Sequence, residues 1–317
     1  MTDARNDKSM ISLVFSFRNE ADVLEELIAR VTKMFAGVGC PYEVIFVNDL
    51  STDDSLKILE KHAAANKAIK IINMSRNFGV SECVLAGMKY AKGDAIIYMD
   101  TDLQDPPEVI PEMIEKWREG ADLVYTRRLS RDGETAFRLW ATKVAYKIIN
   151  FRSEIELPIE AGDFRLLSRR AVDKLLTLEE SQPYLRGITQ WIGFERAEVP
   201  YRRQPRAAGE THFPGVFSRG PVKTFVDGLT SFSMFPLHLV LYAGLAGTAL
   251  GAGGLVLTGL AALIGWGCAV AGWVFFALLL WGGLMSGMGI LGLYISRIYR
   301  DTRNRPLYIV KDTVNFD

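Results

Sequence analysis

The chain has 317 residues, of which 49% are apolar, and 37 Lys and Arg residues balance 37 Asp and Glu residues, so the formal net charge is zero. That balance argues against a disordered tail protein and against a generic basic nucleic-acid binder. The three cysteines and three histidines are too scattered to indicate a disulfide framework or a zinc site, and we expect no cleaved secretion signal at the polar N-terminus.

In the first part of the chain, short apolar runs rich in β-branched residues alternate with stretches of helical periodicity. The apolar runs occupy residues 11–17, 42–48, 69–74, 95–99 and 123–125. Helical periodicity lies between them, for example over residues 21–35 and 55–65. This alternation predicts an α/β domain with a mostly parallel sheet, which we expect to fill residues 1–213.

Polar residues follow the predicted strands. They are Asn19-Glu20, Asn48-Asp49, Arg76-Asn77 and Asp100-Thr101-Asp102. Open α/β sheets bind ligands at the carboxyl edge of their strands, so this edge is the candidate site. No GxGxxG motif follows the first strand and no P-loop motif occurs, so neither a dinucleotide-dependent oxidoreductase nor a P-loop nucleotidase is indicated.

Carboxylates at this edge could hold a diphosphate through a divalent cation, because hard oxygen ligands match Mg²⁺ or Mn²⁺. Asp100 and Asp102, two residues apart after the fourth strand, are the first candidates as ligands. The alternative interpretation is an acidic loop that caps the next helix. Asp49 could accept hydrogen bonds from a base or ribose, or it could cap a helix together with Ser51.

Basic residues form a second group. Its members are Arg127, Arg128, Arg131, Arg138, Lys143, Arg165, Arg202, Arg203 and Arg206. Guanidinium groups bind phosphate bidentately, so a few of these residues are candidates for contact with a lipid phosphate or a leaving diphosphate. Taken singly, most of them fit surface or lipid-facing charges better than a phosphate site. The run Gly162-Asp163-Phe164-Arg165 adds a carboxylate that suits a pocket wall.

The C-terminal part differs sharply from the rest, because residues 239–296 contain no Asp, Glu, Lys, Arg or His. This run predicts two membrane-spanning helices within residues 237–296, roughly Leu237 to Ile264 and Cys268 to Tyr294. Basic residues flank both ends of this run, at residues 201–223 on one side and in the tail at residues 297–317 on the other. The positive-inside rule therefore predicts that both termini and the α/β domain are cytoplasmic. We expect a multi-pass protein of the inner (plasma) membrane.

The segment at residues 214–236 mixes apolar side chains with Arg219 and Lys223. It predicts amphipathic helices along the membrane surface, with a plain linker as the alternative. Glycines are frequent in the two predicted spans and would let helices approach closely, so we expect a homo-oligomer. The spans contain no ionisable side chain, which favours an anchor over a transporter.

Six segments carry a family resemblance. They are Phe17 to Glu20, Val47 to Asp53, Ser75 to Gly79, Asp100 to Glu108, Ala161 to Leu166 and Trp191 to Phe194. Together they resemble the family 2 glycosyltransferases that have the GT-A fold and act on polyisoprenyl phosphates. The chain is similar over nearly its whole length to GtrB-like bacterial undecaprenyl-phosphate glucosyltransferases and to dolichol-phosphate mannose synthases, and the predicted helical pair matches the GtrB-like subgroup.

The resemblance implies roles for individual residues. The nucleotide sugar would contact Phe17, Glu20, Asp49, Arg76, Gly79 and Asp100. The metal ion, Mg²⁺ or Mn²⁺, would be held by Asp100, Asp102 and Gln104. The acceptor phosphate would meet Arg128, Arg131, Arg138, Lys143, Arg165 and Arg206. The catalytic residues would be Asp163, Arg128 and Arg131.

Three residues depart from the family pattern. Leu50 occupies a position that is usually Gly, and we expect it to disturb the turn near the base. Val80 stands where Lys often follows Asn-Phe-Gly, which removes a cation beside the nucleotide. His212 replaces a usual Lys and would need a proton to serve as an acceptor contact.

The resemblance implies inverting transfer of a hexose from a nucleotide sugar to a polyisoprenyl phosphate, with UDP-glucose and undecaprenyl phosphate as the favoured pair. A phosphate monoester has a second pKa of about 6 and is already ionised near neutrality, so we predict that Asp163 mainly positions other groups. Two alternatives remain, a GDP-mannose-dependent mannose synthase and a non-catalytic membrane scaffold. A processive polysaccharide synthase is disfavoured because Gln190-Trp191 lacks the QxxRW spacing.

Overall fold

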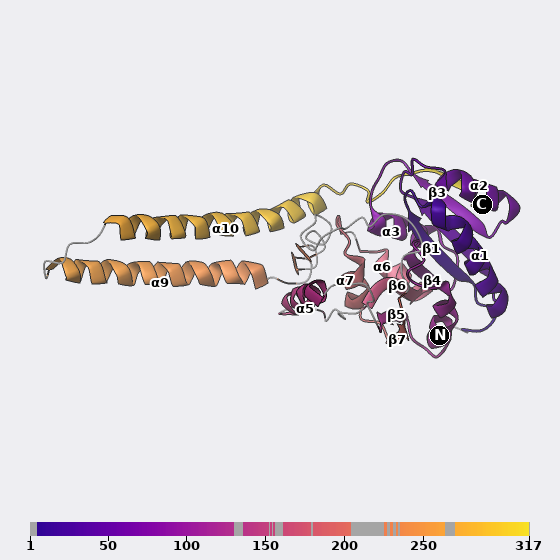
Figure 1. Ribbon diagram of the computed structural model, residues 1–317, viewed down its shortest axis with the longest axis horizontal. Helices are drawn as coiled ribbons and strands as arrows, with labels where there is room; N and C mark the ends of the chain where they lie inside the picture. The colour runs from indigo at the N-terminus through magenta and orange to yellow at the C-terminus, as the bar shows by residue number, and fades with distance from the viewer. Residues whose placement is uncertain are drawn as a thin grey trace.

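A computed structural model provides the three-dimensional structure (Figure 1). It describes residues 5–129, 136–151, 153, 155, 161–178, 180–203, 225–226, 229–230, 233, 235–263 and 270–316. An α/β domain lies at one end, and two long helices project from it side by side.

A single eight-stranded sheet forms the centre of the domain, with the strand order β7-β5-β6-β4-β1-β2-β3-β8. The strands are β1 (Ile11–Phe17), β2 (Tyr42–Asn48), β3 (Ile69–Met74), β4 (Ala95–Asp100), β5 (Leu123–Arg128), β6 (Ala161–Ser168), β7 (Arg196–Tyr201) and β8 (Val310–Val314). β1 pairs in parallel with β2 and β4, and β2 pairs in parallel with β3, as predicted. β6 runs antiparallel between β4 and β5, and β8 runs antiparallel to β3.

Helices cover both faces of the sheet. The helices of the domain are α1 (Ala21–Val38), α2 (Ser55–Ala65), α3 (Val80–Tyr90), the 3₁₀ helix η1 (Pro107–Val109), α4 (Ile110–Arg118), α5 (Ala136–Asn150), α6 (Arg169–Leu175) and α7 (Leu185–Trp191). One apolar core joins Leu13 and Phe15 of β1 to α1 and α4, and a second joins Val14 to α3, α6 and α7. The central strands are apolar on both faces for this reason.

The packing of α3 against β1 depends on a glycine. A Cβ atom at Gly87 would lie 2.3 Å from Cγ1 of Val14. Only a residue without a side chain allows this approach. α3 is thereby held flat on the sheet, and the loop before it, residues 75–79, lies at the carboxyl ends of the strands.

β8 extends the domain beyond the limits expected from the sequence. Residues 310–314 were predicted to belong to a basic tail, yet they form the edge strand of the sheet. Three of the five residues, Lys311, Asp312 and Thr313, are polar and exposed, which is typical of an edge strand and hides the apolar alternation that marks the inner strands. The α/β domain is therefore made of two segments of the chain, one on each side of the long helices.

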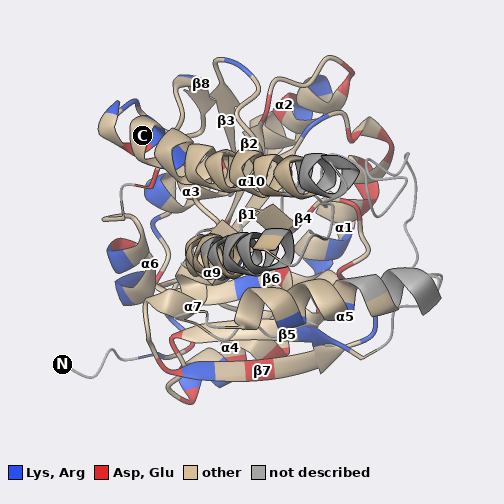
Figure 2. Cartoon of the chain, turned by 90° about the vertical axis from the view of Figure 1, so that its left-hand side faces the viewer, with Lys and Arg blue, Asp and Glu red and all other residues tan. Residues whose placement is uncertain are grey.

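The two long helices are α9 (Phe235–Leu263) and α10 (Val270–Thr302). Their described residues carry few charges compared with the domain helices (Figure 2). α10 ends on the domain, where Arg297 pairs with Glu180 at 3.2 Å and the Ser181 amide donates to Asp301 at 3.0 Å. Large apolar side chains on the pair are exposed, among them Leu241, Leu245, Trp281 and Leu284.

Among the described residues, no helix is both long enough and apolar enough to cross a membrane. The predicted hairpin at residues 237–296 is therefore not confirmed and stays a prediction. Most of the predicted interface segment, residues 214–236, lies outside the described residues.

Candidate active site

The carboxyl ends of four neighbouring strands lie at one edge of the sheet, as predicted. The register places Phe17 beside Asn48, Asn48 beside Asn73, and Ser16 beside Asp100. The polar residues that follow these strands are therefore brought together although they are far apart in the sequence. This edge is the candidate active site.

Asp49 holds the loop that precedes α3. Its carboxylate accepts hydrogen bonds from Asn77 Nδ2 at 2.6 Å and from the amides of Phe78 and Gly79 at 2.7 and 3.1 Å. The side chain is buried, so these bonds are well shielded from water. On the same loop, Arg76 Cζ lies 4.0 Å from the centroid of the Phe78 ring. Asp49 thus shapes the predicted nucleotide loop and does not cap α2.

The turn after β2 adopts the left-handed backbone conformation at Leu50, where φ is 60°. This conformation favours glycine, and a bulky residue in it costs about 1–2 kcal/mol. The Leu50 side chain is 45% exposed. The strained turn that the sequence predicted is therefore present. It is held by Asn19, whose amide donates to Ser51 Oγ at 3.1 Å and whose Oδ1 accepts from the Thr52 amide at 2.7 Å.

Two other predicted nucleotide contacts are tied to the fold, one by ring packing and one by a backbone hydrogen bond. Phe17 is buried and packs edge-on against Phe46, with 6.3 Å between ring centroids. Glu20 precedes α1, and its amide donates to Ser55 Oγ at 2.9 Å. As placed, Phe17 meets the site through its backbone, because its carbonyl oxygen accepts from the Asp49 amide at 3.0 Å.

The acidic turn after β4 is anchored by a buried leucine. Leu103 has φ 56° and is only 1% exposed, so its side chain enters the core while the residues on either side remain at the edge. The Gln104 amide donates to Asp102 Oδ1 at 3.1 Å, which fixes the turn. Burial, reinforced by the charges of Asp163, Asp105 and Asp102, raises the pKa of Asp100 to about 7.

The predicted metal ligands occupy this turn. Among the described residues, no group of three or more His, Cys, Asp or Glu side chains is arranged to hold a metal ion. Two carboxylates with a glutamine are nevertheless a suitable donor set for Mg²⁺ or Mn²⁺ in the presence of a diphosphate, because such ions are commonly bound by one or two carboxylates plus substrate phosphates. The crowding of carboxylates that raises the pKa of Asp100 also fits a cation site.

Arg128, at the end of β5, is fixed by a buried carboxylate. Its Nε donates to Tyr201 Oη at 3.1 Å, its Nη2 lies 3.8 Å from Asp105 Oδ2, and the Tyr201 hydroxyl donates to Asp105. A Cβ atom at Gly162 would lie 2.9 Å from Arg128 Nη2, so a larger residue there would displace the guanidinium group. The sequence did not mark Asp105 as a site residue, although it belongs to the DLQDPPE run.

Asp163 forms a bidentate ion pair with a residue that the sequence did not indicate. Arg186 Nε donates to Asp163 Oδ1 at 2.7 Å, and Arg186 Nη2 donates to Asp163 Oδ2. Burial opposes ionisation of Asp163, but the charge and hydrogen bonds of Arg186, with the charges of Arg165 and Arg128, lower its pKa to about 2. The only sequence signal for Arg186 is a cationic residue in the otherwise uncharged run at residues 183–194.

The remaining predicted arginines and lysines are not gathered equally. Arg165 is buried, and it donates to the carbonyl oxygens of Gly162 and Arg186 at 3.1 Å and to Thr189 Oγ1. In this structure Arg165 therefore holds α7 against β6 and does not face an acceptor. Lys143 is exposed on α5. Arg138 lies in α5 with its side chain undescribed, whereas Arg131 and Arg206, like His212, lie outside the described residues.

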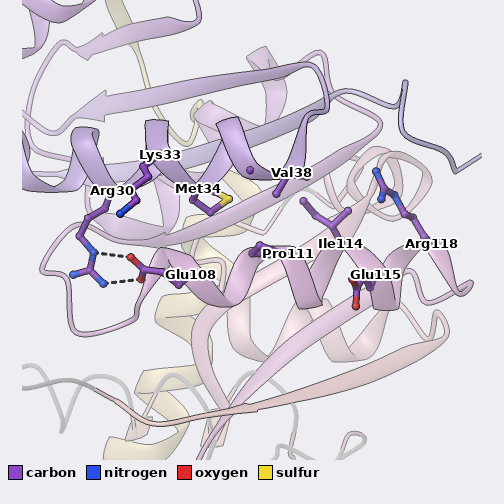
Figure 3. Close-up of a pocket in the computed structure, with 10 residues that line it drawn as sticks. Arg30, Lys33, Met34, Val38, Glu108, Pro111, Ile114, Glu115 and Arg118 are labelled. Carbon is purple, nitrogen blue, oxygen red and sulfur yellow. Dashed lines mark hydrogen bonds and ion pairs between the residues drawn. The ribbon is translucent and has the colours of Figure 1, made fainter.

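A pocket of about 520 Å³ lies elsewhere, between α1 and α4 (Figure 3). Arg30 on α1 donates to both carboxylate oxygens of Glu108 there, at 3.0 and 2.7 Å. Glu108 ends the DLQDPPE run, so this part of the motif joins α1 to η1. We assign the chemistry to the strand edge, where carboxylates and arginines converge.

Comparison with known proteins identifies the family. The family model described as Glycosyl transferase family 2 matches residues 12–176. The chain is also 39% identical to the uncharacterized glycosyltransferase YkcC of Bacillus subtilis over 310 residues, which is 96% of this chain and 94% of that protein. The chain belongs to glycosyltransferase family 2.

Other similarities agree with the family and the fold. This glycosyltransferase is 36% identical to the prophage bactoprenol glucosyl transferase homolog of Escherichia coli, over 95% of this chain and 98% of that protein. A solved complex of glucosyl-3-phosphoglycerate synthase from Mycobacterium tuberculosis with Mn²⁺, UDP-glucose and phosphoglyceric acid gives a TM-score of 0.50 at 20% identity, covering 72% of this chain and 82% of that one. The predicted GT-A-like α/β fold with a mostly parallel sheet is confirmed.

Proposed function

We propose that this glycosyltransferase transfers glucose from UDP-glucose to a polyisoprenyl phosphate, undecaprenyl phosphate, with inversion at the anomeric carbon. The observation that carries the proposal is the bidentate pair that holds Arg186 on Asp163, with Arg128 held nearby on Asp105. Such a site suits an anionic acceptor. The name of the Escherichia coli relative, which refers to bactoprenol and glucosyl transfer, supports the same acceptor and sugar.

The nucleophile explains why Asp163 need not remove a proton. An acceptor phosphate is ionised near neutrality, with a second pKa of about 6. Asp163, whose pKa is about 2, is a weak base at that pH. Its role is to orient Arg186, and with it the positive charge that meets the acceptor phosphate. Electrostatic stabilisation of the developing charge then contributes more than proton transfer.

The donor lies along the edge formed by β1, β2 and β4. Asp49 fixes the loop that carries Arg76, and this loop meets the nucleotide. Asp100 and Asp102, with Gln104, would hold Mg²⁺ or Mn²⁺, which neutralises charge on the leaving nucleoside diphosphate. The presence of Mn²⁺ and UDP-glucose in the Mycobacterium tuberculosis complex is consistent with this assignment for a protein of the same fold.

Helices α9 and α10 serve as a membrane anchor in this proposal. The uncharged run at residues 239–296 and the exposed apolar side chains of the two helices support a lipid environment. The basic residues that flank the run favour the inner membrane, with the catalytic domain and both termini on the cytoplasmic side. The anchor places the active site beside the phosphate of a water-insoluble acceptor, and close helix packing through glycines favours a homo-oligomer.

The proposal is tested by incubating the full chain in undecaprenyl-phosphate membranes with labelled UDP-glucose, UDP-N-acetylglucosamine or GDP-mannose, with and without EDTA. We expect solvent-extractable label from UDP-glucose and its loss with EDTA. An Asp102→Ala variant serves as the matched control for the metal. Label from GDP-mannose alone would assign the protein to mannose transfer, and no label from any donor would overturn the enzymatic proposal.

A further inference from the structure

The polypeptide returns to the catalytic domain after α10 (Figure 1) and adds β8 to the sheet beside β3 (Figure 2). The carbonyl oxygen of Ile309 first accepts a hydrogen bond from the Ser75 amide at 2.9 Å. Tyr308 and Phe316 then pack against the same apolar core as α3, and Phe316 meets Tyr90 edge-on at 5.4 Å. The C-terminal segment is therefore an integral part of the domain, next to the loop that Asp49 holds.

A chain of hydrogen bonds runs from β8 to the turn after β2. Asn73 Nδ2 donates to Asp312 Oδ1, and Asn48 Nδ2 donates to Asn73 Oδ1 at 3.0 Å. Asn48 Oδ1 accepts from the Ser51 amide at 2.8 Å, and Ser51 Oγ accepts from the Asn19 amide at 3.1 Å. The chain crosses β3, β2 and β1 at their carboxyl ends.

The direction of this chain is set by Asp312. An ionised carboxylate only accepts hydrogen bonds, so Asn73 must turn its NH₂ group towards β8 and its oxygen towards Asn48. Asn48 must then turn its own NH₂ group towards Asn73, which leaves its oxygen for the Ser51 amide. The opposite orientation of Asn48 would set an NH₂ group against that amide, with two donors facing each other.

These hydrogen bonds are costly to break because the two asparagine side chains are buried. Asn48 is 5% exposed and Asn73 is 8% exposed, so neither amide has free access to water. A buried polar group that loses its partner costs about 1–3 kcal/mol. The turn that these hydrogen bonds hold, residues 48–52, contains Asp49 and also Leu50, whose backbone conformation is strained. The orientation of the turn thus depends on its hydrogen-bond partners.

We infer that the C-terminal strand is a working part of the donor site, in which Asp312 acts through Asn73 and Asn48 as a positioning residue for the turn at residues 48–52. This inference rests on the proposed function, because that function places the nucleotide along the strand edge where this turn lies. It gives the residues after α10 a role in donor binding. It also connects the end of α10 to the donor site, because only residues 303–309 separate α10 from β8.

The test compares Asp312→Ala with Asp312→Asn and Thr313→Ala in the full chain, with UDP and Mn²⁺ as the binding probe. Asp312→Ala removes the acceptor, and loss of one such hydrogen bond predicts a rise of about threefold to tenfold in the UDP dissociation constant and the donor KM. The acceptor KM should stay unchanged. Asp312→Asn retains a carbonyl acceptor and should restore binding, and Thr313→Ala, at the neighbouring exposed position, should behave as wild type.

Amide hydrogen exchange of residues 48–52 gives a second measurement that needs no nucleotide. We expect faster exchange in the folded Asp312→Ala protein and wild-type exchange in the other two variants. Wild-type UDP binding and wild-type exchange in Asp312→Ala would overturn the inference and leave the proposed function intact. If the wild-type protein binds no UDP, the donor assignment fails, and the exchange rates alone decide whether Asp312 positions the turn.

Discussion

Arg186 of α7 donates hydrogen bonds to both carboxylate oxygens of Asp163 of β6. The two residues are 23 positions apart, and the pair joins the helix to the sheet at the candidate active site. Arg186 also donates to Tyr146 Oη of α5 at 3.3 Å. The pair therefore fixes an arginine charge at the site and keeps Asp163 ionised.

Replacing Arg186 with Gln should abolish most of the activity. The variant loses the charge that offsets the burial of Asp163, so we expect kcat to fall by about 10²–10³ and the pKa of Asp163 to rise. Arg186→Lys keeps a charge without the bidentate geometry and should have intermediate activity. Turnover of both variants at pH 5–8, with thermal unfolding as the control for folding, checks this. Wild-type kcat in a folded Arg186→Gln protein would contradict the role of the pair.

Asp163→Asn distinguishes a positioning carboxylate from a base. A positioning role predicts that the variant is impaired by the same factor at every pH between about 6.5 and 8.5, where the acceptor phosphate is already ionised. In the wild-type protein, protonation of Asp163 should not lower the activity at any pH above about 4, because the pKa of Asp163 lies near 2. The rate of glucosyl transfer is measured against pH. Recovery of the variant at high pH would instead favour a true base.

The acidic turn predicts a pH-dependent effect of metal on stability. The pKa of Asp100 is raised to about 7, so the folded protein holds a proton that the unfolded chain releases near pH 4. The contribution of this proton to the free energy of unfolding is fully present below about pH 4 and is lost as the pH rises from about 4 to 7. A cation needs the ionised form, so Mn²⁺ added together with UDP should raise Tm, relative to UDP alone, more at pH 8 than at pH 5.5. Asp102→Ala should remove the effect, and an equal shift at both pH values would argue against a site at Asp100.

Leu50 and Leu103 share a left-handed backbone conformation but differ in burial. Leu50→Gly relieves about 1–2 kcal/mol of strain, partly offset by the roughly 0.5–1 kcal/mol that glycine loses in chain entropy, so it should raise Tm slightly. Leu103→Gly removes a buried side chain and should destabilise the fold by about 2–5 kcal/mol. Thermal or urea unfolding of both variants checks the contrast. Destabilisation of similar size in the two would refute the explanation from burial.

The sequence predicts the centre of the fold because the information there is local. Buried parallel strands are continuous apolar runs, and the polar residues that follow them, such as Asp49 and Asp100, must meet at one edge. Strands β6, β7 and β8 were missed. β8 is short, polar and exposed, and its partner β3 lies more than 200 residues away, so no pattern within the strand reveals the pairing.

The candidate site was predictable where one motif carries it and unpredictable where it depends on tertiary contacts. Asp102 and Gln104 occupy one turn, as their spacing indicates. Arg165 and Arg186 have the same chemistry, yet β6 and α7 bury the first and bring the second to Asp163. Which arginine meets the carboxylate is decided by the packing of α7. Asp105 was missed for the same reason, since its partners Arg128 and Tyr201 come from β5 and β7.

The most direct test of the account compares two acceptors that differ only in the phosphate. The full chain in membranes is given labelled UDP-glucose with either undecaprenyl phosphate or undecaprenol, and label in the lipid fraction is followed over time. An arginine-lined site without a base near neutrality predicts transfer to the phosphate at least about 10²-fold faster than to the alcohol. Transfer to undecaprenol at a comparable rate, or none to undecaprenyl phosphate, would contradict it.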